Sequence, residues 1–266
     1  MEIRLLGAHN LASRATGHTC FLIDGVLGVD AGSVASALTW EEQQRVAAIL
    51  LTHRHFDHLR DIPTVGLATL GAPTQIELYG LPETLDALHS HILNGDVYPD
   101  LTQGLNGSPA RFSLHHIERS VPFQVLGYQV KPVPMHHGEA PAVGYIVRSP
   151  TGGCVAYTGD TSGDLLPLLQ DALAPGVLFV DVTFPDRLAD RAEASAHLTP
   201  SSLRSRLRTA QDAGARLPRL VPVHLDLETA DEVTAELATV GAELGIDLTP
   251  GTEGATIVVG QQHDAS

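Results

Sequence analysis

The sequence predicts an α+β fold in which two mixed β-sheets pack face to face with helices outside them. Short strand signals alternate with helical signals along all 266 residues, and no linker or low-complexity segment separates them. Strand signals predominate in the middle of the chain, whereas helical signals occur in both halves. Because this length suits one large domain, we expect residues 1–266 to form a single domain.

The first third is predicted to open with strands and to continue with alternating helices and strands. In chain order, the elements are a strand at 3–6, a hairpin at 20–23 and 26–29, a helix at 34–45, a strand at 47–51, a helix after residue 58, a strand at 75–79 and a helix at 82–93. Asp24 and Gly25 supply the positive-φ residues of a tight hairpin turn. The apolar run that ends at Leu51 is typical of a buried strand.

The middle of the chain is β-rich, and the last third again alternates helices with strands. Strand signals lie at 112–114, 121–125, 128–133, 144–147, 155–157, 177–182, 220–223 and 256–259. Helical signals lie at 164–173, from residue 199 onward and at 228–244. Thr199 is a favourable N-cap, and Pro200 is a favourable first residue for the helix that follows it.

The charge of the chain argues against a large polyanionic partner. There are 16 Lys and Arg residues against 31 Asp and Glu residues, a formal net charge of −15, and Lys131 is the only lysine. A surface that binds a folded nucleic acid normally carries a basic stripe, and the sequence shows none. A few arginines could still line one groove, so a nucleic acid stays an alternative substrate.

Other features of the composition indicate a cytoplasmic protein. No apolar run approaches the roughly 18 residues of a membrane span, so we expect no membrane partner. The first residues have the pattern of a strand and not of a signal peptide. Cys20 and Cys154 are too few for a disulfide framework, and their apolar contexts predict buried, inert thiols, with metal ligation as the alternative.

The strongest chemical signal is the segment 52–58, Thr-His-Arg-His-Phe-Asp-His, directly after a predicted buried strand. It places three imidazoles and one carboxylate within six residues. Imidazole suits zinc, manganese and iron, and a carboxylate oxygen adds a harder ligand. The spacing can supply two neighbouring ions, one from His53 and His55 and the other from Asp57 and His58.

Further candidate ligands follow three other apolar runs. They are the pair His136 and His137, then Asp160 in a Thr-Gly-Asp-Thr turn, and finally His224. Taken singly, a histidine after a strand or an aspartate in a glycine turn is usually structural. Together with the segment 52–58, these residues predict a complete site for two metal ions.

These motifs resemble those of the metallo-β-lactamase fold superfamily. Its Thr-His-x-His-x-Asp-His motif matches residues 52–58, its Thr-Gly-Asp-Thr motif matches residues 158–161, and its late histidine matches His224. The resemblance implies an αββα four-layer sandwich that holds two divalent ions, Zn²⁺ or Mn²⁺. It implies that one ion is held by His53, His55 and His137. The other ion is held by Asp57, His58 and His224, and Asp160 bridges both.

Alignment with phosphodiesterase-like members of that superfamily favours one of the two adjacent histidines without excluding the other. It places the ligand at His137, seven residues before Gly144, and His136 would then point into the wall of the site or bond to a group behind the ligands. Asp181, at the end of a predicted strand, could orient a ligand histidine or could simply be a strand-end aspartate.

Two finer resemblances narrow the chemistry to phosphodiesters. His197 in the segment Ala-His-Leu-Thr is similar to the His-x-Thr motif of ribonuclease Z and related phosphodiesterases, whose extra histidine helps to protonate the leaving oxygen. Residues 85–100 resemble a segment of class II cyclic-nucleotide phosphodiesterases, with Leu93 in place of a phenylalanine and Tyr98 in place of a tryptophan. This second resemblance implies that Asn94 and Tyr98 contact the substrate.

The sequence also departs from ribonuclease Z. The stretch 7–14 lacks the Pro-Thr-Lys-x-Arg-like loop of that enzyme, and no basic, glycine-rich insertion could clamp a transfer RNA. The sequence therefore favours a phosphodiesterase that acts on cyclic nucleotides or other small nucleotide phosphodiesters and assembles as a homodimer. The alternatives are a ribonuclease Z-like nuclease on single-stranded RNA or DNA, a lactone or thiolester hydrolase, and a non-catalytic metal-binding module.

The expected mechanism combines two metal ions with two side chains. A water that bridges the ions loses its proton near neutral pH, and the ions clamp the phosphate. Asp57 and Asp160 hold the ions and can accept a proton from the nucleophile. His197 is the predicted acid for the departing ribose oxygen, since an imidazole titrates near neutral pH.

Overall fold

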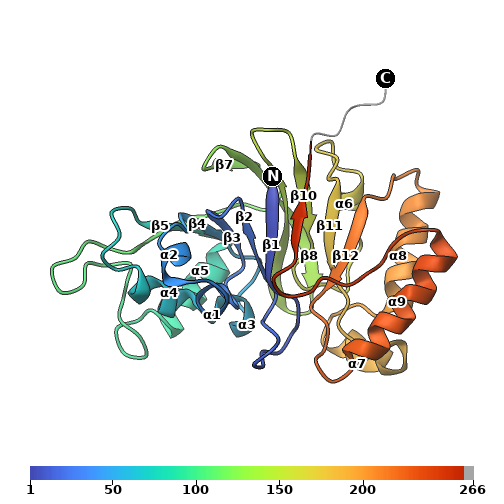
Figure 1. Ribbon diagram of the computed structural model, residues 1–266, viewed down its shortest axis with the longest axis horizontal. Coiled ribbons are helices and arrows are strands. Elements are labelled where there is room, and N and C mark those ends of the chain that lie inside the picture. Colours follow the sequence, from blue (N-terminus) through green and yellow to red (C-terminus); the bar gives the residue numbers. More distant parts are fainter. Residues whose placement is uncertain (261–266) are drawn as a thin grey trace.

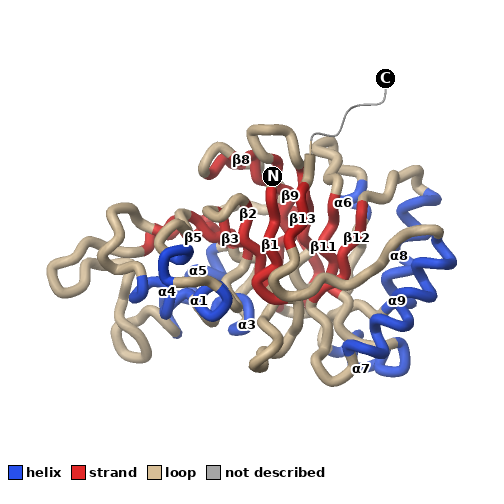
Figure 2. The backbone as a smooth tube through the Cα atoms, viewed as in Figure 1, coloured by secondary structure: helices blue, strands red, loops and turns tan. Residues whose placement is uncertain are grey.

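Two mixed β-sheets form the centre of the molecule, and helices cover their outer faces (Figure 1). The structure is a computed structural model and describes residues 1–260. Figure 2 shows the strands in red at the centre with blue helices on both sides. This arrangement confirms the predicted α+β sandwich with four layers.

The first sheet has seven strands in the order β13-β1-β2-β3-β4-β5-β6. Their bounds are β1 Glu2–Gly7, β2 Cys20–Ile23, β3 Leu27–Val29, β4 Ala48–Leu50, β5 Ile76–Gly80, β6 Phe112–His116 and β13 Thr256–Val258. From β3 to β6 neighbouring strands are parallel, whereas β1, β2 and β13 pair in antiparallel fashion. The predicted hairpin turn is confirmed, because Asp24 and Gly25 have φ values of 47° and 73°.

The second sheet has six strands in the order β12-β11-β10-β9-β8-β7. Their bounds are β7 Phe123–Val125, β8 Tyr128–His137, β9 Ala140–Arg148, β10 Cys154–Tyr157, β11 Val177–Asp181 and β12 Arg219–Val223. Strands β10, β11 and β12 are parallel, and β9 runs antiparallel to both β8 and β10. Four strands of this sheet, β8, β10, β11 and β12, therefore point the same way.

The helices divide between the two outer faces of the sandwich. On the first sheet lie α1 Val34–Ala37, α2 Trp40–Gln43, α3 Phe56–Leu59, α4 Ile62–Ala68 and α5 Pro82–His91. With the second sheet lie α6 Leu166–Leu169, the 3₁₀ turn η1 Asp186–Leu188, α7 Ala189–Ala194, α8 Pro200–Asp212 and α9 Ala230–Leu244. Among residues 1–260, no helix is long and apolar enough to cross a membrane.

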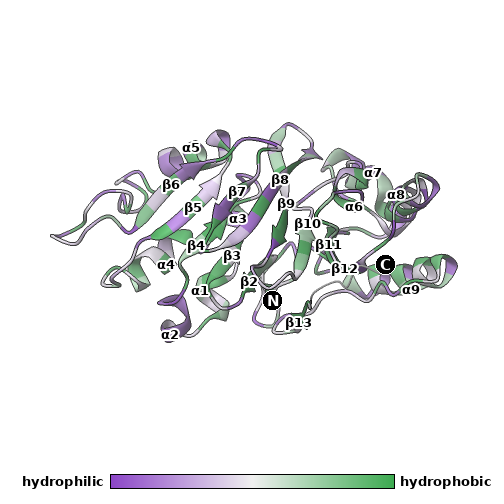
Figure 3. Ribbon diagram, turned by 90° about the horizontal axis from the view of Figure 1, so that it is seen from above, coloured by the Kyte–Doolittle hydropathy of each residue, from purple (hydrophilic) through white to green (hydrophobic). Residues whose placement is uncertain are grey.

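Both faces of the central strands are buried, which explains why their sequences are continuously apolar. In β2, Phe21 and Ile23 face the core between the sheets, whereas Leu22 faces the helices. The ring centroids of Phe21 and Phe179 lie 4.5 Å apart and join the two sheets. In Figure 3 strands β10, β11 and β12 are mostly green, β5 and β8 also carry purple, and the helices beside the sheets carry both colours.

The structure corrects the predicted helix at 34–45, which is two short helices. Leu38 adopts an extended conformation, with φ −104° and ψ 143°. Thr39 then starts α2 with a capping box, in which its hydroxyl accepts from the Glu42 amide and the Glu42 carboxylate accepts from the Thr39 amide. This local cap is more favourable than continuing one helix through Leu38.

One other predicted helix is wrong in extent, and two short helical elements were not predicted. The helix expected at 164–173 is the single turn α6, because Asp171 accepts from the amide of Leu173 and Ala174 has a positive φ of 46°. The turn η1 and helix α7 were not predicted at all. Of the residues in α7, only Ala192 is buried, so that segment lacks the apolar periodicity that would indicate a helix.

The two cysteines are free, buried thiols, as predicted. Burial raises the pKa of the Cys154 thiol to about 11 and also raises that of Cys20. Both thiols are therefore protonated and unreactive at neutral pH.

Candidate metal centre

The predicted site residues lie where strands from both sheets end. Strand β3 leads to Asp30, β4 leads to the segment 52–58, β10 leads to Asp160 and β12 leads to His224. Parallel strands bring their carboxyl ends to one edge, and an open sheet places functional groups there. At two of these ends the backbone enters the left-handed region, with φ 57° at Asp30 and 64° at His224.

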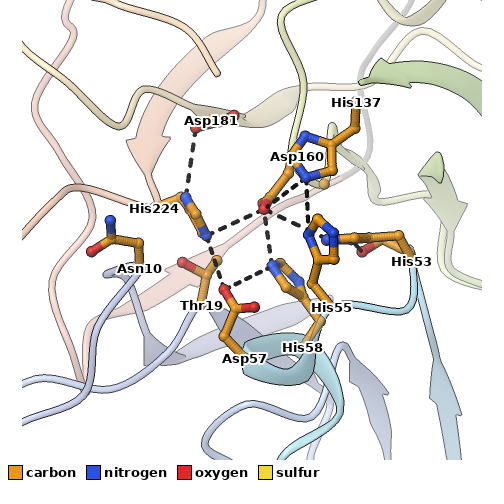
Figure 4. Close-up of polar contacts among 12 residues, drawn as sticks. Asn10, Thr19, His53, His55, Asp57, His58, His137, Asp160, Asp181 and His224 are labelled. Carbon is orange, nitrogen blue, oxygen red and sulfur yellow. Dashed lines mark hydrogen bonds and ion pairs between the residues drawn. The ribbon is translucent and has the colours of Figure 1, made fainter. Parts of the chain in front are cut away.

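Asp160 is the centre of the cluster (Figure 4). Its Oδ2 lies 3.7 Å from His53 Nε2, 3.8 Å from His137 Nε2 and 3.4 Å from His224 Nε2. Its Oδ1 lies 3.3 Å from His58 Nε2. The carboxylate is 2% exposed, so these imidazoles and not solvent surround it.

The structure brings all seven predicted ligands together in two groups that share Asp160. The first group is His53, His55, His137 and Asp160, and the second is Asp57, His58, Asp160 and His224. His55 Nδ1 lies 3.1 Å from His137 Nε2 in the first group, and Asp57 Oδ2 lies 3.3 Å from His224 Nε2 in the second. This division is the one that the motif resemblance implies.

Of the two adjacent histidines, His137 faces the cluster. It is 4% exposed, and its Nδ1 bonds to the carbonyl of Ala196. His136 is exposed, and its carbonyl accepts from the hydroxyl of Thr161 and the amide of Ser162. Successive residues of a strand point to opposite faces, so only one of the pair can reach the site.

Hydrogen bonds on the outer side of the cluster fix the tautomers of its buried histidines. The hydroxyl of Thr52 donates to Asp30, so its oxygen is left to accept from His53 Nδ1 at 3.0 Å. In the same way His58 Nδ1 donates to Asp30 Oδ2 at 2.7 Å. Each ring therefore carries its proton on Nδ1 and turns the Nε2 lone pair toward the cluster.

His224 and His137 are oriented by the same principle. The hydroxyl of Thr183 donates to Asp181 Oδ1, and its oxygen accepts from His224 Nδ1 at 2.9 Å. The carbonyl oxygen of Ala196 can only accept a hydrogen bond, so His137 Nδ1 donates to it. When the rings are neutral, four imidazoles thus present Nε2 lone pairs to one carboxylate, an arrangement that repels itself unless protons or cations lie between them.

Two buried atoms of the cluster confirm that the donor set fits metal ions. His53 Nε2 and Asp160 Oδ1 are inaccessible to solvent and have no hydrogen-bond partner among the described residues. A buried polar atom without a partner is unfavourable unless an ion satisfies it. Imidazole nitrogen with carboxylate oxygen is a donor set suited to Zn²⁺ and other divalent transition metals.

The pKa values of the cluster reflect the crowding of these groups. Burial lowers the pKa of His53 well below its usual range. Burial would also lower the pKa of His58, but the carboxylates of Asp160, Asp57 and Asp30 hold it well above that range. Burial would raise the pKa of Asp160, yet His224 and His58 hold it well below its usual range. Metal binding would replace the proton on His58.

Comparison with known proteins agrees with this geometry. Residues 19–225 match the Beta-lactamase superfamily domain. The chain belongs to the metallo-β-lactamase superfamily. The match covers all seven clustered residues, from His53 to His224.

Sequence relatives within the metallo-β-lactamase superfamily include enzymes named for phosphodiester cleavage. Ribonuclease Z of Mycobacterium sp. (strain KMS) is 28% identical over 177 residues, which are 61% of this chain and 57% of the relative. The chain thus spans little more than half the length of that relative. A 3′,5′-cyclic-nucleotide phosphodiesterase of Aliivibrio fischeri is 21% identical over 228 residues, 71% of this chain and 67% of the relative.

Solved structures of the superfamily share the fold over almost the whole chain. Unliganded yeast PDE1 superposes with a TM-score of 0.81 at 16% identity, over 97% of this chain and 99% of that one. Human tRNase Z, short form, superposes with a TM-score of 0.66 at 19% identity, over the same shares of the two chains. At these identities the likeness shows the fold alone.

His197 lies beside both groups of clustered side chains, and a carboxylate lies behind its ring. Its Nδ1 lies 2.8 Å from Asp181 Oδ2, and its ring centroid lies 5.1 Å from that of His137 and 5.0 Å from that of His224. Burial would lower the pKa of His197, but Asp181 raises it to about 9. The ring also lines an open hollow of about 610 Å³, whose other lining residues include His136 and Arg206 but none of the seven clustered residues.

Asn94 and Tyr98 are not brought to the cluster. The Asn94 amide bonds to the backbone of Ser90, Asp96 and Val97 and closes the turn after α5. Tyr98 packs against the core between the first sheet and its helices. Neither side chain has a hydrogen bond or ion pair to the cluster within the described part of the chain, and their substrate contacts stay a prediction.

Sequence reasoning missed Asp30, which holds two parts of the site in place. Asp30 is fully buried, and besides His58 it accepts from the amide and hydroxyl of Thr52. A signal was available, because Asp30 follows an apolar strand just as the predicted ligands do.

We expect Asp30→Asn to weaken metal binding about 10- to 100-fold, since removing a group that orients metal ligands has effects of this size. The amide keeps the size of the carboxylate but loses the charge that faces His58 Nδ1. Competition with a chromogenic chelator measures the affinity. Asp212→Asn at the exposed end of α8 is the matched control, and equal affinities in the two variants would contradict the role of Asp30.

Proposed function

We propose that this protein is a metal-dependent phosphodiesterase that hydrolyses 3′,5′-cyclic nucleotides or other small nucleotide phosphodiesters. The observation that carries the proposal is the placement of His197, backed by Asp181, beside both ligand groups. An acid at that position suits a reaction with a poor leaving group. The relative from Aliivibrio fischeri, named a 3′,5′-cyclic-nucleotide phosphodiesterase, supports the same bond type.

The seven clustered residues are proposed to hold two ions: His53, His55 and His137; Asp57, His58 and His224; and Asp160 between the two sets. Two divalent ions, Zn²⁺ or Mn²⁺, would neutralise charge on the phosphoryl oxygens and supply a nucleophile at neutral pH, which lets a chain of net charge −15 bind an anion.

Two side chains of the cluster are proposed to move protons. Because His197 Nδ1 is engaged by Asp181, Nε2 is the atom that can donate to the departing ribose oxygen. The carboxylate of Asp181, 2.8 Å from Nδ1, raises the pKa of His197 and so favours the protonated ring that an acid requires. The side chain of Asp57 is 27% exposed, whereas that of Asp160 is 2% exposed. Asp57 is therefore the ligand carboxylate that can accept a proton from an attacking water.

A ribonuclease Z-like nuclease is the second candidate, favoured by the relative of that name from Mycobacterium. The charge balance of 16 basic to 31 acidic residues opposes it, since a polynucleotide is held mainly through its phosphates. Lactone or thiolester hydrolysis is a third reaction that the same ligand groups could support.

A substrate panel tests the proposal. The metal-loaded protein, with Zn²⁺ or Mn²⁺, is offered cyclic AMP, cyclic GMP, 2′,3′-cyclic nucleotides, single-stranded RNA, precursor tRNA and a lactone. We expect turnover of at least one cyclic nucleotide at a higher kcat/KM than any polynucleotide. Turnover of the lactone with none of the phosphodiesters would overturn the proposal, and precursor tRNA as the best substrate would favour the nuclease.

A further inference from the structure

An open hollow of about 600 Å³ lies between the segment 54–56 and helix α5. Its lining includes Arg54, His55, Phe56, Glu83, Asp86 and Ser90. His55 belongs both to this lining and to the first ligand group, so the hollow borders the candidate metal centre. A ligand held at the centre can therefore extend along this hollow.

The aromatic ring of Phe56 is exposed at the edge of the candidate metal centre. It is 62% exposed, although it lies between the ligand residues His55 and Asp57 and although His58 and Leu59 of the same helix are buried. A large apolar side chain at the rim of a polar site is a common platform for an aromatic ligand. Nucleotide bases stack on such rings.

Helix α5 offers hydrogen-bond acceptors across the hollow from this ring. Thr84, Leu85 and Leu88 of α5 are buried in the core, and the opposite face carries Glu83 and Asp86. Arg119 lies 3.5 Å from Glu83 on the surface. Carboxylates attract N–H donors and repel phosphate, so a nucleotide would place its phosphate at the metal centre and its base in the hollow.

We propose that this hollow is the subsite for the base of a nucleotide, with Phe56 as the stacking platform and Asp86 and Glu83 as acceptors for the N–H groups of the base. Guanine fits these acceptors best, because N1–H and the N2 amino group form adjacent donors on one edge. The inference rests on the proposed function, since it assumes that the metal centre receives the phosphate of a nucleotide.

Calorimetric titration of the metal-loaded protein with GMP, AMP and ribose 5-phosphate tests the subsite directly. We expect GMP to bind about tenfold more tightly than ribose 5-phosphate, as one stacked base would produce. Phe56→Ala should abolish that difference, Phe56→Tyr should retain it, and Asp86→Asn should bring GMP and AMP closer in affinity. Val97→Ala, at another exposed apolar residue outside this lining, is the control and should behave as wild type.

Equal binding of GMP and ribose 5-phosphate to the wild-type protein would overturn the inference. So would retention of the GMP preference in Phe56→Ala. Diester turnover measured on the same samples separates the two proposals. Base-dependent binding without hydrolysis of any diester would defeat the proposed function alone, and hydrolysis without base-dependent binding would defeat the subsite alone. Should Phe56→Ala fail to fold, Phe56→Tyr and Asp86→Asn still decide the outcome.

Discussion

Asp160→Asn should remove most of the bound metal and lower phosphodiester turnover by about a thousandfold or more, since metal ions contribute several kcal/mol to such reactions. The carboxylate is 2% exposed and lies within 3.8 Å of four imidazole Nε2 atoms. An amide of the same size cannot neutralise two cations, and its NH₂ group would face nitrogen lone pairs or metal. Inductively coupled plasma mass spectrometry counts the metal, and a diester assay measures turnover.

The control for this variant is Asp212→Asn, an exposed carboxylate at the end of α8. It should retain both metal and turnover. Full metal content together with full turnover in Asp160→Asn would show that this carboxylate is not a ligand. Circular dichroism of both variants shows whether a loss of metal or turnover is caused by unfolding instead.

His197→Ala should lower turnover of a cyclic nucleotide about 100- to 10,000-fold, the range in which general acids contribute, while the metal content stays that of the wild type. The effect should depend on the leaving group. A ribose alkoxide needs a proton as it departs, whereas 4-nitrophenolate is stable without one. The loss should therefore be much smaller for methyl 4-nitrophenyl phosphate than for the cyclic nucleotide.

Two outcomes would contradict the role of His197. Loss of metal in His197→Ala would make the ring a ligand, as its place in a third group with Asp181 and His224 allows. An equal loss of turnover for the cyclic nucleotide and for methyl 4-nitrophenyl phosphate would exclude proton donation by His197. Asp181→Asn tests the partner, because loss of the carboxylate lowers the pKa of His197 and so moves the alkaline limit of activity to lower pH.

The clustering of the candidate ligands could be predicted from sequence because these residues stand at strand ends in short motifs. Apolar runs fix where each strand ends, and the segment 52–58 alone carries four of the seven clustered residues. The choice of His137 over His136 came from alignment with phosphodiesterase-like members of the superfamily, since strand alternation says only that one residue of the pair faces the cluster.

The supporting groups could not be predicted because they act across long stretches of chain. Asp30 bonds to His58 across 28 residues, and Thr183 bonds to His224 across 41. No local periodicity signals such pairs. The bounds of the short helices could not be predicted for a related reason. A single capping residue, Thr39, decides where α2 begins. The base subsite depends on the exposure of Phe56, which only the packing of α3 reveals.

The left-handed backbone at Asp30 and His224 ties heat resistance to metal supply. Each such residue other than glycine costs about 1 kcal/mol or more in the native chain, so the apoprotein is held below the stability that this fold could reach. Ions that bind only the native chain add RT ln(1 + [L]/Kd) to its stability. The melting temperature of the metal-loaded protein should therefore fall when a chelator is added.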